Sequence, residues 1–209
     1  MFLDMANQAV PMRQIRAHHT STTITVYQAY NTEIADAANE QQKLDASPKF
    51  STTRMTWIKP SWAWMLYRSG YSYKDAGQER ILALTLTHAA FLSLLKKAKL
   101  SHHPKANIEA GGESQASVRV QWDPERTIRL ERLPYRSIQI GVPGALVGEL
   151  LKGIVKIEDV TKRARALKKV LDMTDHIDGE ELIAQGFVVK EQVFDVDEAL
   201  EELLGMTET

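Results

Sequence analysis

The sequence predicts a mixed α+β fold, and three observations lead to this prediction. Short segments rich in β-branched and aromatic residues alternate like strands, early and again late in the chain. Between them, apolar residues recur at helical spacing behind residues that can cap a helix. The length of 209 residues, 44% of them hydrophobic, is sufficient for one substantial core. We therefore expect one α+β domain over 12–174, after a flexible extension over 1–11.

Composition argues against several kinds of protein and site. The net charge of -1 produces no global field that would attract a polyanion. The chain has no cysteine, which removes disulfides and thiolate sites and fits a reducing compartment. No apolar run approaches the roughly 20 residues that span a bilayer. We expect a cytoplasmic protein with no membrane partner, and no metal site, because His18-His19 and His102-His103 are adjacent pairs that cannot share one ion.

The first part of the chain reads as strand, strand and helix. We expect strands at 12–17 and 22–30, and then a helix that begins after Asn31 or Thr32. A polar loop follows. A short aromatic helix is expected at 62–69, because Ser61 can cap its start.

The aromatic helix lies in a segment that holds three of the four tryptophans. Aromatic residues contribute strongly to burial, so a packed core explains them. Basic residues interleave with the aromatic ones, which also fits a concave site for a flat, anionic ligand. Both interpretations stay open at this stage.

The second part of the chain predicts further strands and then helices. A strand begins near Glu79, and Thr87 caps the following helix. After a loop at 101–115, the expected strands are 116–122, 127–133 and 136–142, the first of them broken at Asp123-Pro124. From Pro143 the pattern is helical, with Ile157, Val160, Ala164, Leu167 and Leu171 on one face.

The opposite face of this last helix is basic, and the segment after it is acidic. Lysine and arginine residues between 162 and 169 form either a solvated face or a contact for a polyanion. Residues 175–209 form an acidic segment whose final helix, 196–205, is capped by Asp195.

Motifs for common nucleotide and hydrolase folds do not occur. The sequence has no P-loop, no G-x-G-x-x-G after a strand and no G-x-S-x-G elbow. The segment "YKDAG" resembles the K-x-D-G nucleophile motif of nucleic-acid ligases, which would make Lys74 the nucleophile. Here the aspartate adjoins the lysine, and the downstream lysine-rich ligase motif does not occur.

Glu79 precedes an apolar run in "GQERILALTLT". If a strand starts there, Glu79 shares a face with Ile81 and Ala83 and looks into a cleft, while Leu82 and Leu84 point into the core. A fixed carboxylate at a cleft can bond a ribose hydroxyl and stabilise positive charge at a sugar carbon. This chemistry is glycosyl transfer; the alternative is a surface ion pair with Arg80 or Lys74.

Several of these segments resemble one family. "MRQIRA", "ITVYQAYN", "RMTWIKPS", "GQERILAL" and "RSIQIGV" are similar to the bacterial and fungal Domain of Unknown Function 4291 family, from about Met12 to about Thr174. Membership of that family implies no function.

A second resemblance is to NAD-dependent ADP-ribosyltransferases of the DNA-modifying toxin type. It lies in the order "VYQAYNTEIADAA", "WIKPSWAWMLY" and "QERILAL". The likeness implies a split two-sheet β core with flanking helices, NAD as substrate, and Glu79 with Gln78 as catalytic residues. The implied NAD-binding residues are Arg13, Arg16, Tyr27, Gln28, Tyr30, Trp57, Lys59, Ser61, Tyr67 and Arg68. Arg13 and Arg16 are alternatives for the diphosphate, whose shape suits a guanidinium. Gln28 stands where the toxins have histidine.

The functional expectation is therefore transfer of ADP-ribose from NAD to an unknown acceptor, with nucleic acid among the candidates. The alternatives are a non-catalytic module that binds a nucleotide or single-stranded nucleic acid, and a ligase-like nucleotidyltransferase that uses Lys74. The oligomeric state and the acceptor are not specified by the residues.

Overall fold

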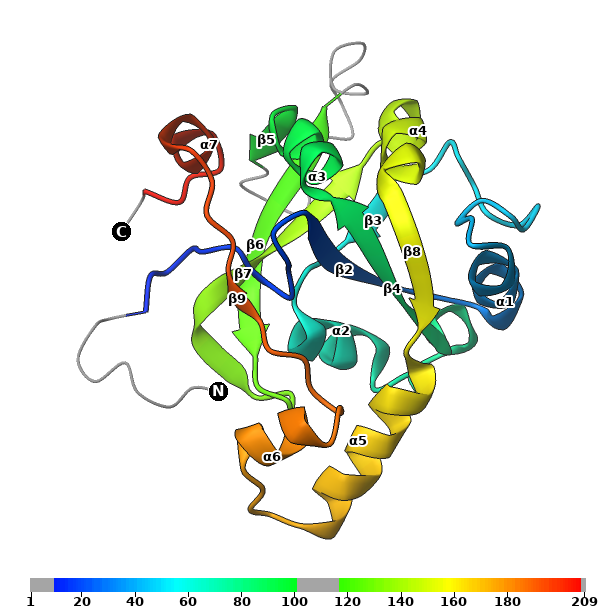
Figure 1. Cartoon of the computed structure of the whole chain (residues 1–209), viewed down its shortest axis with the longest axis vertical. Coiled ribbons are helices and arrows are strands. Elements are labelled where there is room, and N and C mark those ends of the chain that lie inside the picture. Colours follow the sequence, from blue (N-terminus) through cyan, green and yellow to red (C-terminus); the bar gives the residue numbers. More distant parts are fainter. Residues whose placement is uncertain (1–9, 101–116, 208–209) are drawn as a thin grey trace.

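The structure, a computed structural model, describes residues 10–100 and 117–207 and has the predicted α+β fold (Figure 1). Its strands form sheets of two, three and four strands. The three-stranded sheet has the order β2 (Thr23–Tyr30), β4 (Arg80–Thr87), β8 (Ile154–Asp159). The four-stranded sheet has the order β3 (Thr56–Ile58), β7 (Arg132–Val142), β6 (Val118–Arg126), β5 (Ala98–Leu100). The small sheet pairs β1 (Arg16–Ala17) with β9 (Gln192–Val193).

The two larger sheets meet at one point, where β2 crosses the end of β3. The backbone N–H of Tyr27 donates to the carbonyl of Lys59 at 2.8 Å, and the N–H of Lys59 donates back at 3.2 Å. In the three-stranded sheet, β4 is antiparallel to both neighbours. In the four-stranded sheet, only the pair of β5 and β6 is parallel. The two larger of the three sheets therefore share a seam at the start of the aromatic helix.

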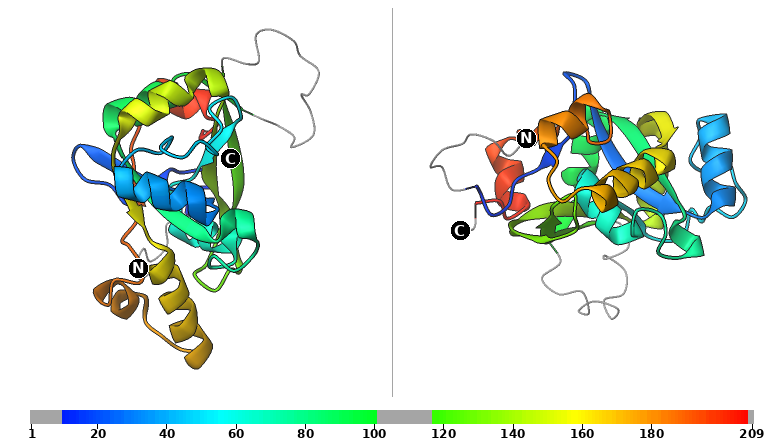
Figure 2. Two further views of the ribbon diagram at one scale, coloured as in Figure 1. Left: turned by 90° about the vertical axis from the view of Figure 1, so that its right-hand side faces the viewer. Right: turned by 90° about the horizontal axis from the view of Figure 1, so that it is seen from below.

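The helices cover both ends of the sheets (Figure 2). They are α1 (Thr32–Gln41), α2 (Trp62–Ser69), α3 (His88–Leu95), α4 (Gly144–Gly153), α5 (Thr161–Met173), α6 (Gly179–Ala184) and α7 (Glu198–Leu203), with a 3-10 turn η1 (Ala76–Gln78). In Figure 1, α3 and α4 lie at one end of the sheets, and α5 and α6 lie at the other. None of the helices described here is long and apolar enough to cross a membrane.

Three predicted helix starts are confirmed by their caps. The side chain of Asn31 accepts the N–H of Ile34, that of Ser61 accepts the N–H of Trp64, and that of Thr87 accepts the N–H of Ala90. Each cap satisfies a backbone donor that the first turn of a helix leaves free. Helix α2 ends at Gly70, whose φ of 55° is the left-handed conformation that glycine adopts without strain.

Both faces of β4 are buried, and this separates two clusters of core residues. One cluster, which includes Leu82, Leu84 and Leu86, packs between the two larger sheets. The other, which includes Ile81 and Ala83, packs against α2, α5 and α6. The face that we expected to look into a cleft is therefore filled with side chains.

Several predicted boundaries are wrong, and the expected strand 12–17 is reduced to β1. The expected strands 127–133 and 136–142 are one strand, β7, because residues 127–131 form the turn of a hairpin in which Leu130 has a φ of 70°. Strand β6 continues through Pro124, where the register shifts between Pro124 and Arg126. A bulge tolerates proline, since the ladder there needs no N–H from it. Ile157 belongs to β8, not to the helix, and Asp197, not Asp195, caps α7.

The acidic C-terminal segment packs into the fold up to the last described residues. Strand β9 pairs with β1, and Phe194, Leu200 and Leu204 are buried in the main core. Arg13 donates to the carbonyl of Gly205 at 2.7 Å. The C-terminal segment is therefore part of the main core, together with residues next to and within β1. The loop expected at 101–115 lies outside the described residues.

Candidate functional site

A cavity of about 1290 Å³ lies where β1, the start of α2, the β6–β7 hairpin and the segment 177–193 meet. Its walls are mostly apolar, with contributions from Trp62, Leu182 and Val189. Polar groups enter it from five elements or connections, and they include Arg16, Ser61, Glu125, Tyr135 and Glu191. Ligand pockets are typically apolar cavities of about 300–1,000 Å³ with a few convergent polar groups. This cavity is therefore large enough for a dinucleotide.

The first turn of α2 holds two carboxylates. Pro60 and Ser61 start the helix, and Ser61 is fully buried. The Ser61 hydroxyl accepts the N–H of Trp64 at 3.1 Å and donates to Oε1 of Glu125 at 2.8 Å. The N–H of Trp62 donates to Oε1 of Glu191 at 2.6 Å. Both oxygens thus lie on hydrogen-bond donors at the start of the helix, where backbone N–H groups have no partner within the helix.

Glu125 is held rigidly at the end of β6. It is only 5% exposed. Its Oε1 accepts the N–H of Arg126 at 2.8 Å in addition to the Ser61 hydroxyl. The register shift between Pro124 and Arg126 lies at this residue, and bulges of this kind redirect side chains. Glu125 is thus a buried acid oriented by two donors.

Arg16 places a cation beside these acids. Its guanidinium lies 4.6 Å from the ring centre of Tyr135, which also lines the cavity. Its Nη2 donates to Oε1 of Gln14 at 2.6 Å. Burial lowers the pKa of Arg16, while Tyr135, Glu125 and Glu191 act in the opposite direction. An arginine remains charged under these conditions, so the cavity contains a half-buried guanidinium.

Glu191 is the second acid of the cavity and comes from the connection between α6 and β9. The residue keeps part of its surface open, but its carboxyl group is enclosed by protein. Burial, followed by the charge of Glu125, raises the pKa of Glu191 to about 8. The Trp62 N–H and the Arg16 charge counteract this rise only in part. Glu191 is therefore mainly protonated at neutral pH.

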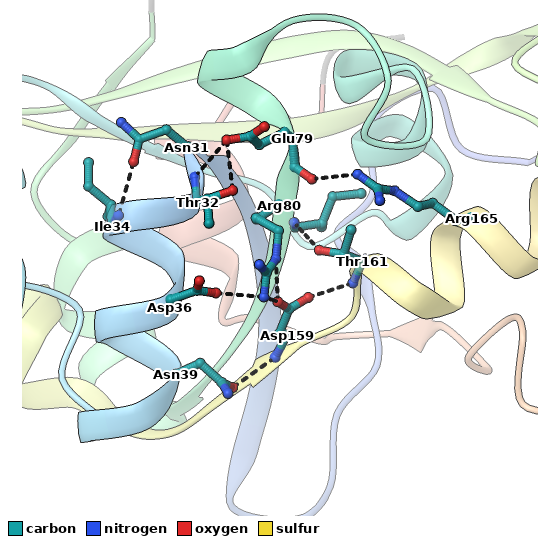
Figure 3. A network of polar contacts seen from close by, with 11 residues as sticks. Asn31, Thr32, Ile34, Asp36, Asn39, Glu79, Arg80, Asp159, Thr161 and Arg165 are labelled. Carbon is teal, nitrogen blue, oxygen red and sulfur yellow. Dashed lines mark hydrogen bonds and ion pairs between the residues drawn. The ribbon is translucent and has the colours of Figure 1, made fainter.

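Glu79, the predicted catalytic residue, does not line this cavity. It follows η1 with helical φ and ψ angles of -79° and -11°, so it precedes the strand instead of belonging to it. Its Oε1 accepts the N–H and the hydroxyl of Thr32 at 2.9 and 2.7 Å (Figure 3). These two hydrogen bonds lower the pKa of Glu79. In this structure Glu79 closes the N-terminus of α1, and Gln78 donates to Asp75 at 2.6 Å.

Arg80, next to Glu79, joins three elements of the fold. Its guanidinium pairs with Asp36 at 2.7 Å, and its Nε donates to Asp159 at 2.7 Å (Figure 3). The other carboxylate oxygen of Asp159 accepts the N–H of Thr161 at 2.8 Å. The network ties α1 and β4 to the start of α5, which is a structural role.

Among the predicted NAD-binding residues, only Arg16 and Ser61 line the cavity. Of the two alternative arginines, Arg13 is bound to the carbonyl of Gly205 instead. Tyr27 is buried with its ring centre 5.1 Å from that of Trp62, directly behind the cavity wall. Gln28 and Tyr30 continue along β2, with Tyr30 packed on Phe50.

The remaining predicted residues lie around α2. Lys59 is buried, with Nζ 3.1 Å from Asp123, 3.2 Å from the carbonyl of Ser137 and 4.1 Å from the ring centre of Trp64. Burial lowers the pKa of Lys59 to about 8. Trp57 stands opposite Gly141 in the four-stranded sheet. The other two, Tyr67 and Arg68, are exposed near the end of α2, as is Lys74 on the turn after it.

Sequence reasoning missed Glu125, Glu191 and Tyr135. The Asp-Pro pair before Glu125 was a signal, because a break in a strand beside an acid marks a bulge, a common feature near functional sites. Glu191 had no comparable signal, since it lies in a segment rich in acids.

Within residues 10–100 and 117–207, no group of three or more His, Asp or Glu side chains is placed to hold a metal ion. A comparison with curated proteins finds no match. Residues 14–194 match the family described as "Domain of unknown function (DUF4291)", which extends the likeness through β9 and into Phe194. The matched part includes both acids of the cavity and Arg16. The chain is therefore a member of the DUF4291 family.

Proposed function

We propose that this protein transfers ADP-ribose from NAD, that the cavity beside α2 is the NAD site, and that Glu125 is the catalytic carboxylate. The supporting observation is that Arg16, Ser61 and Glu125, from three separate elements or connections, converge on one large cavity. The proposal keeps the glycosyl-transfer chemistry expected from the sequence and moves it from Glu79 to Glu125.

The cavity has groups suited to each part of a dinucleotide. A guanidinium fork matches the oxygens of a diphosphate, and Arg16 presents a half-buried guanidinium here. The rings of Tyr135 and Trp62 and the aliphatic side chains provide surfaces for flat bases. Polar groups then fix the orientation of the ligand at the start of α2.

The reaction breaks the bond between nicotinamide and C1 of its ribose, and nicotinamide leaves with the bonding electrons. Positive charge develops on the ribose, and a nucleophile of the acceptor then attacks C1 and loses its proton. Oε1 of Glu125 accepts from Ser61 and the Arg126 N–H, which holds the carboxylate in place. The carboxylate thereby stabilises the developing charge without reorganising, as electrostatic catalysis requires.

Matched glutamate-to-glutamine variants test this proposal. Glu125→Gln should reduce transfer of label from NAD by about 100-fold or more, because the preorganised charge is lost. Glu79→Gln is the control, since glutamine still offers Thr32 an acceptor oxygen. The assay is release of nicotinamide from labelled NAD with DNA, RNA and protein acceptors. Loss of activity in Glu79→Gln with full activity in Glu125→Gln would return the catalytic role to Glu79.

A second candidate function is a non-catalytic module for single-stranded nucleic acid. Tyr67 and Tyr73 are 40% and 56% exposed. Arg126 lies 3.8 Å from the ring centre of Tyr67, and Arg165 lies 4.9 Å from that of Tyr73. Exposed aromatic rings with cations are what a single strand stacks on. This candidate expects oligonucleotide binding that Tyr67→Ala weakens, with no consumption of NAD.

A further inference from the structure

We propose that Glu191 determines which ligands the cavity admits: as a carboxylic acid it donates a hydrogen bond to an anionic nucleotide, and as a carboxylate it repels one. This inference rests on the proposed function, because it concerns the ligand of the same cavity. It adds a residue from the C-terminal segment, which the sequence did not connect with the site.

The charges around Glu191 come from several elements. Arg16 on β1 is the favourable cation, and Glu125 on β6 is the opposing acid. Tyr27 on β2 and Tyr135 on β7 also interact with the charge of Glu191. Asp178, before α6, lines the same cavity but is exposed. If Glu191 were ionised, a diphosphate beside the half-buried Arg16 would face the negative charges of both Glu125 and Glu191.

The second arginine of the cavity wall does not compensate for this excess of acid. The guanidinium of Arg126 lies 3.8 Å from the ring centre of Tyr67 and donates to the carbonyl of Leu130 at 3.2 Å. Arg126 is not among the charges that act on Glu191. Protonation of one of the two acids would remove this repulsion and let the cavity accept a dianion.

Glu191 is the acid that is neutralised. Glu125 is bound by two donors through Oε1, an arrangement that suits a carboxylate. Within the described part of the chain, Glu191 accepts one hydrogen bond, from the Trp62 N–H, and its raised pKa of about 8 keeps it protonated at neutral pH. With Oε1 bound to Trp62, the acidic proton is carried by Oε2. A protonated carboxyl in an apolar cavity is an effective hydrogen-bond donor to an anion.

Binding of ADP-ribose at different pH values tests the inference. This ligand is chosen because its diphosphate does not change charge between pH 7 and pH 9. Its affinity for the wild-type protein, measured by calorimetry, should fall about tenfold from pH 7 to pH 9, because the competent protonated fraction falls by that factor for a pKa of about 8. Glu191→Gln keeps an acceptor for Trp62 and a donor for the ligand, so its affinity should not change with pH. Glu180→Gln, an exposed position on α6, is the matched control and should follow the wild type.

The ligand-free protein provides a second measurement that separates this inference from the proposed function. A raised folded-state pKa adds stability at low pH that is lost as pH rises through about 8. Between pH 5 and pH 8 the wild type should therefore lose thermal stability relative to Glu191→Gln. If the thermal stabilities of the wild type and Glu191→Gln change with pH in parallel, the inference is overturned, whether or not a nucleotide binds. If the stability of the two proteins differs by an amount that changes with pH, but neither ADP-ribose nor NAD binds, the proposed function is overturned. The selection of nucleotides by Glu191 is then overturned as well. Binding by the wild type that is independent of pH would overturn the inference alone.

Discussion

The hydroxyl of Ser61 and the carboxylate of Glu125 lie 2.8 Å apart, and the same hydroxyl caps α2. One side chain thus starts a helix at one wall of the cavity and orients an acid at another. Residues 61 and 125 are joined only through the tertiary fold, since they belong to the start of α2 and the end of β6. This contact links the stability of the aromatic helix to the geometry of the candidate site.

Replacing Ser61 should therefore affect stability and activity together. Ser61→Ala removes the cap and one donor to Glu125, and we expect a loss of about 1–3 kcal/mol in the free energy of unfolding. Turnover of NAD should also fall, because Glu125 is less firmly held. Thr87→Ala is the control, since Thr87 caps α3 away from the cavity. Thr87→Ala should lower the free energy of unfolding by about as much as the loss of one helix cap, and it should leave turnover per folded molecule unchanged. Denaturant unfolding and nicotinamide release measure the two effects.

Two glycines of α4 should respond oppositely to alanine. A Cβ on Gly153 would collide with the Cβ of Ala90 on α3, so Gly153→Ala should cost about 1–3 kcal/mol of stability. A Cβ on Gly148 meets nothing within 4 Å, so Gly148→Ala should stabilise the protein by about 0.5–1 kcal/mol through helix propensity. Urea unfolding of both variants checks the prediction. Equal effects of the two substitutions would show that α3 and α4 do not pack this closely.

Lys59 should make stability depend on pH in the alkaline range. Burial lowers its pKa from 10.5 to about 8, so the folded state holds fewer protons than the unfolded state between these values. The free energy of unfolding of the wild type should consequently rise relative to Lys59→Met as pH increases from 8 to 10. Unfolding curves of both proteins across this range measure the difference. A constant difference would mean that Lys59 titrates normally in the folded protein.

Glu79 should contribute to stability as a cap of α1. Hydrogen bonds from Thr32 lower its pKa, so its contribution is present above the ordinary carboxyl pKa and is lost as pH falls through the folded-state value. Glu79→Ala should be less stable than wild type at pH 7, and the gap should narrow in acid. Combining it with Thr32→Val tests the contact, because the double variant should lose less than the sum of the two single losses. Additive losses would contradict the capping role.

The C-terminal segment should be required for folding. Phe194 is 5% exposed and packs edge-on against Phe91, with ring centres 5.5 Å apart. Phe194→Ala should cost about 3–5 kcal/mol, as expected for truncation of a buried aromatic ring. Thermal unfolding measures this loss. Leu203→Ala, at a position 40% exposed on α7, should cost much less.

Local patterns predicted several helix starts and strands correctly. Asn31, Ser61 and Thr87 cap helices as expected, because capping depends on residues three positions apart. Strand β4 and its position also follow from its own apolar residues. The β6–β7 hairpin was misread as three strands and a break, because a bulge at Pro124 interrupts alternation without ending the strand.

The sequence alone determined the α+β class, the starts of three capped helices and the family. These properties follow from residue type and short-range spacing, both of which are fixed by the sequence before the chain folds. Only the tertiary structure decided that Glu79 caps α1 and that Glu125 and Glu191 meet at the start of α2. The reason is physical: which acid is buried beside another charge depends on contacts between segments more than 60 residues apart.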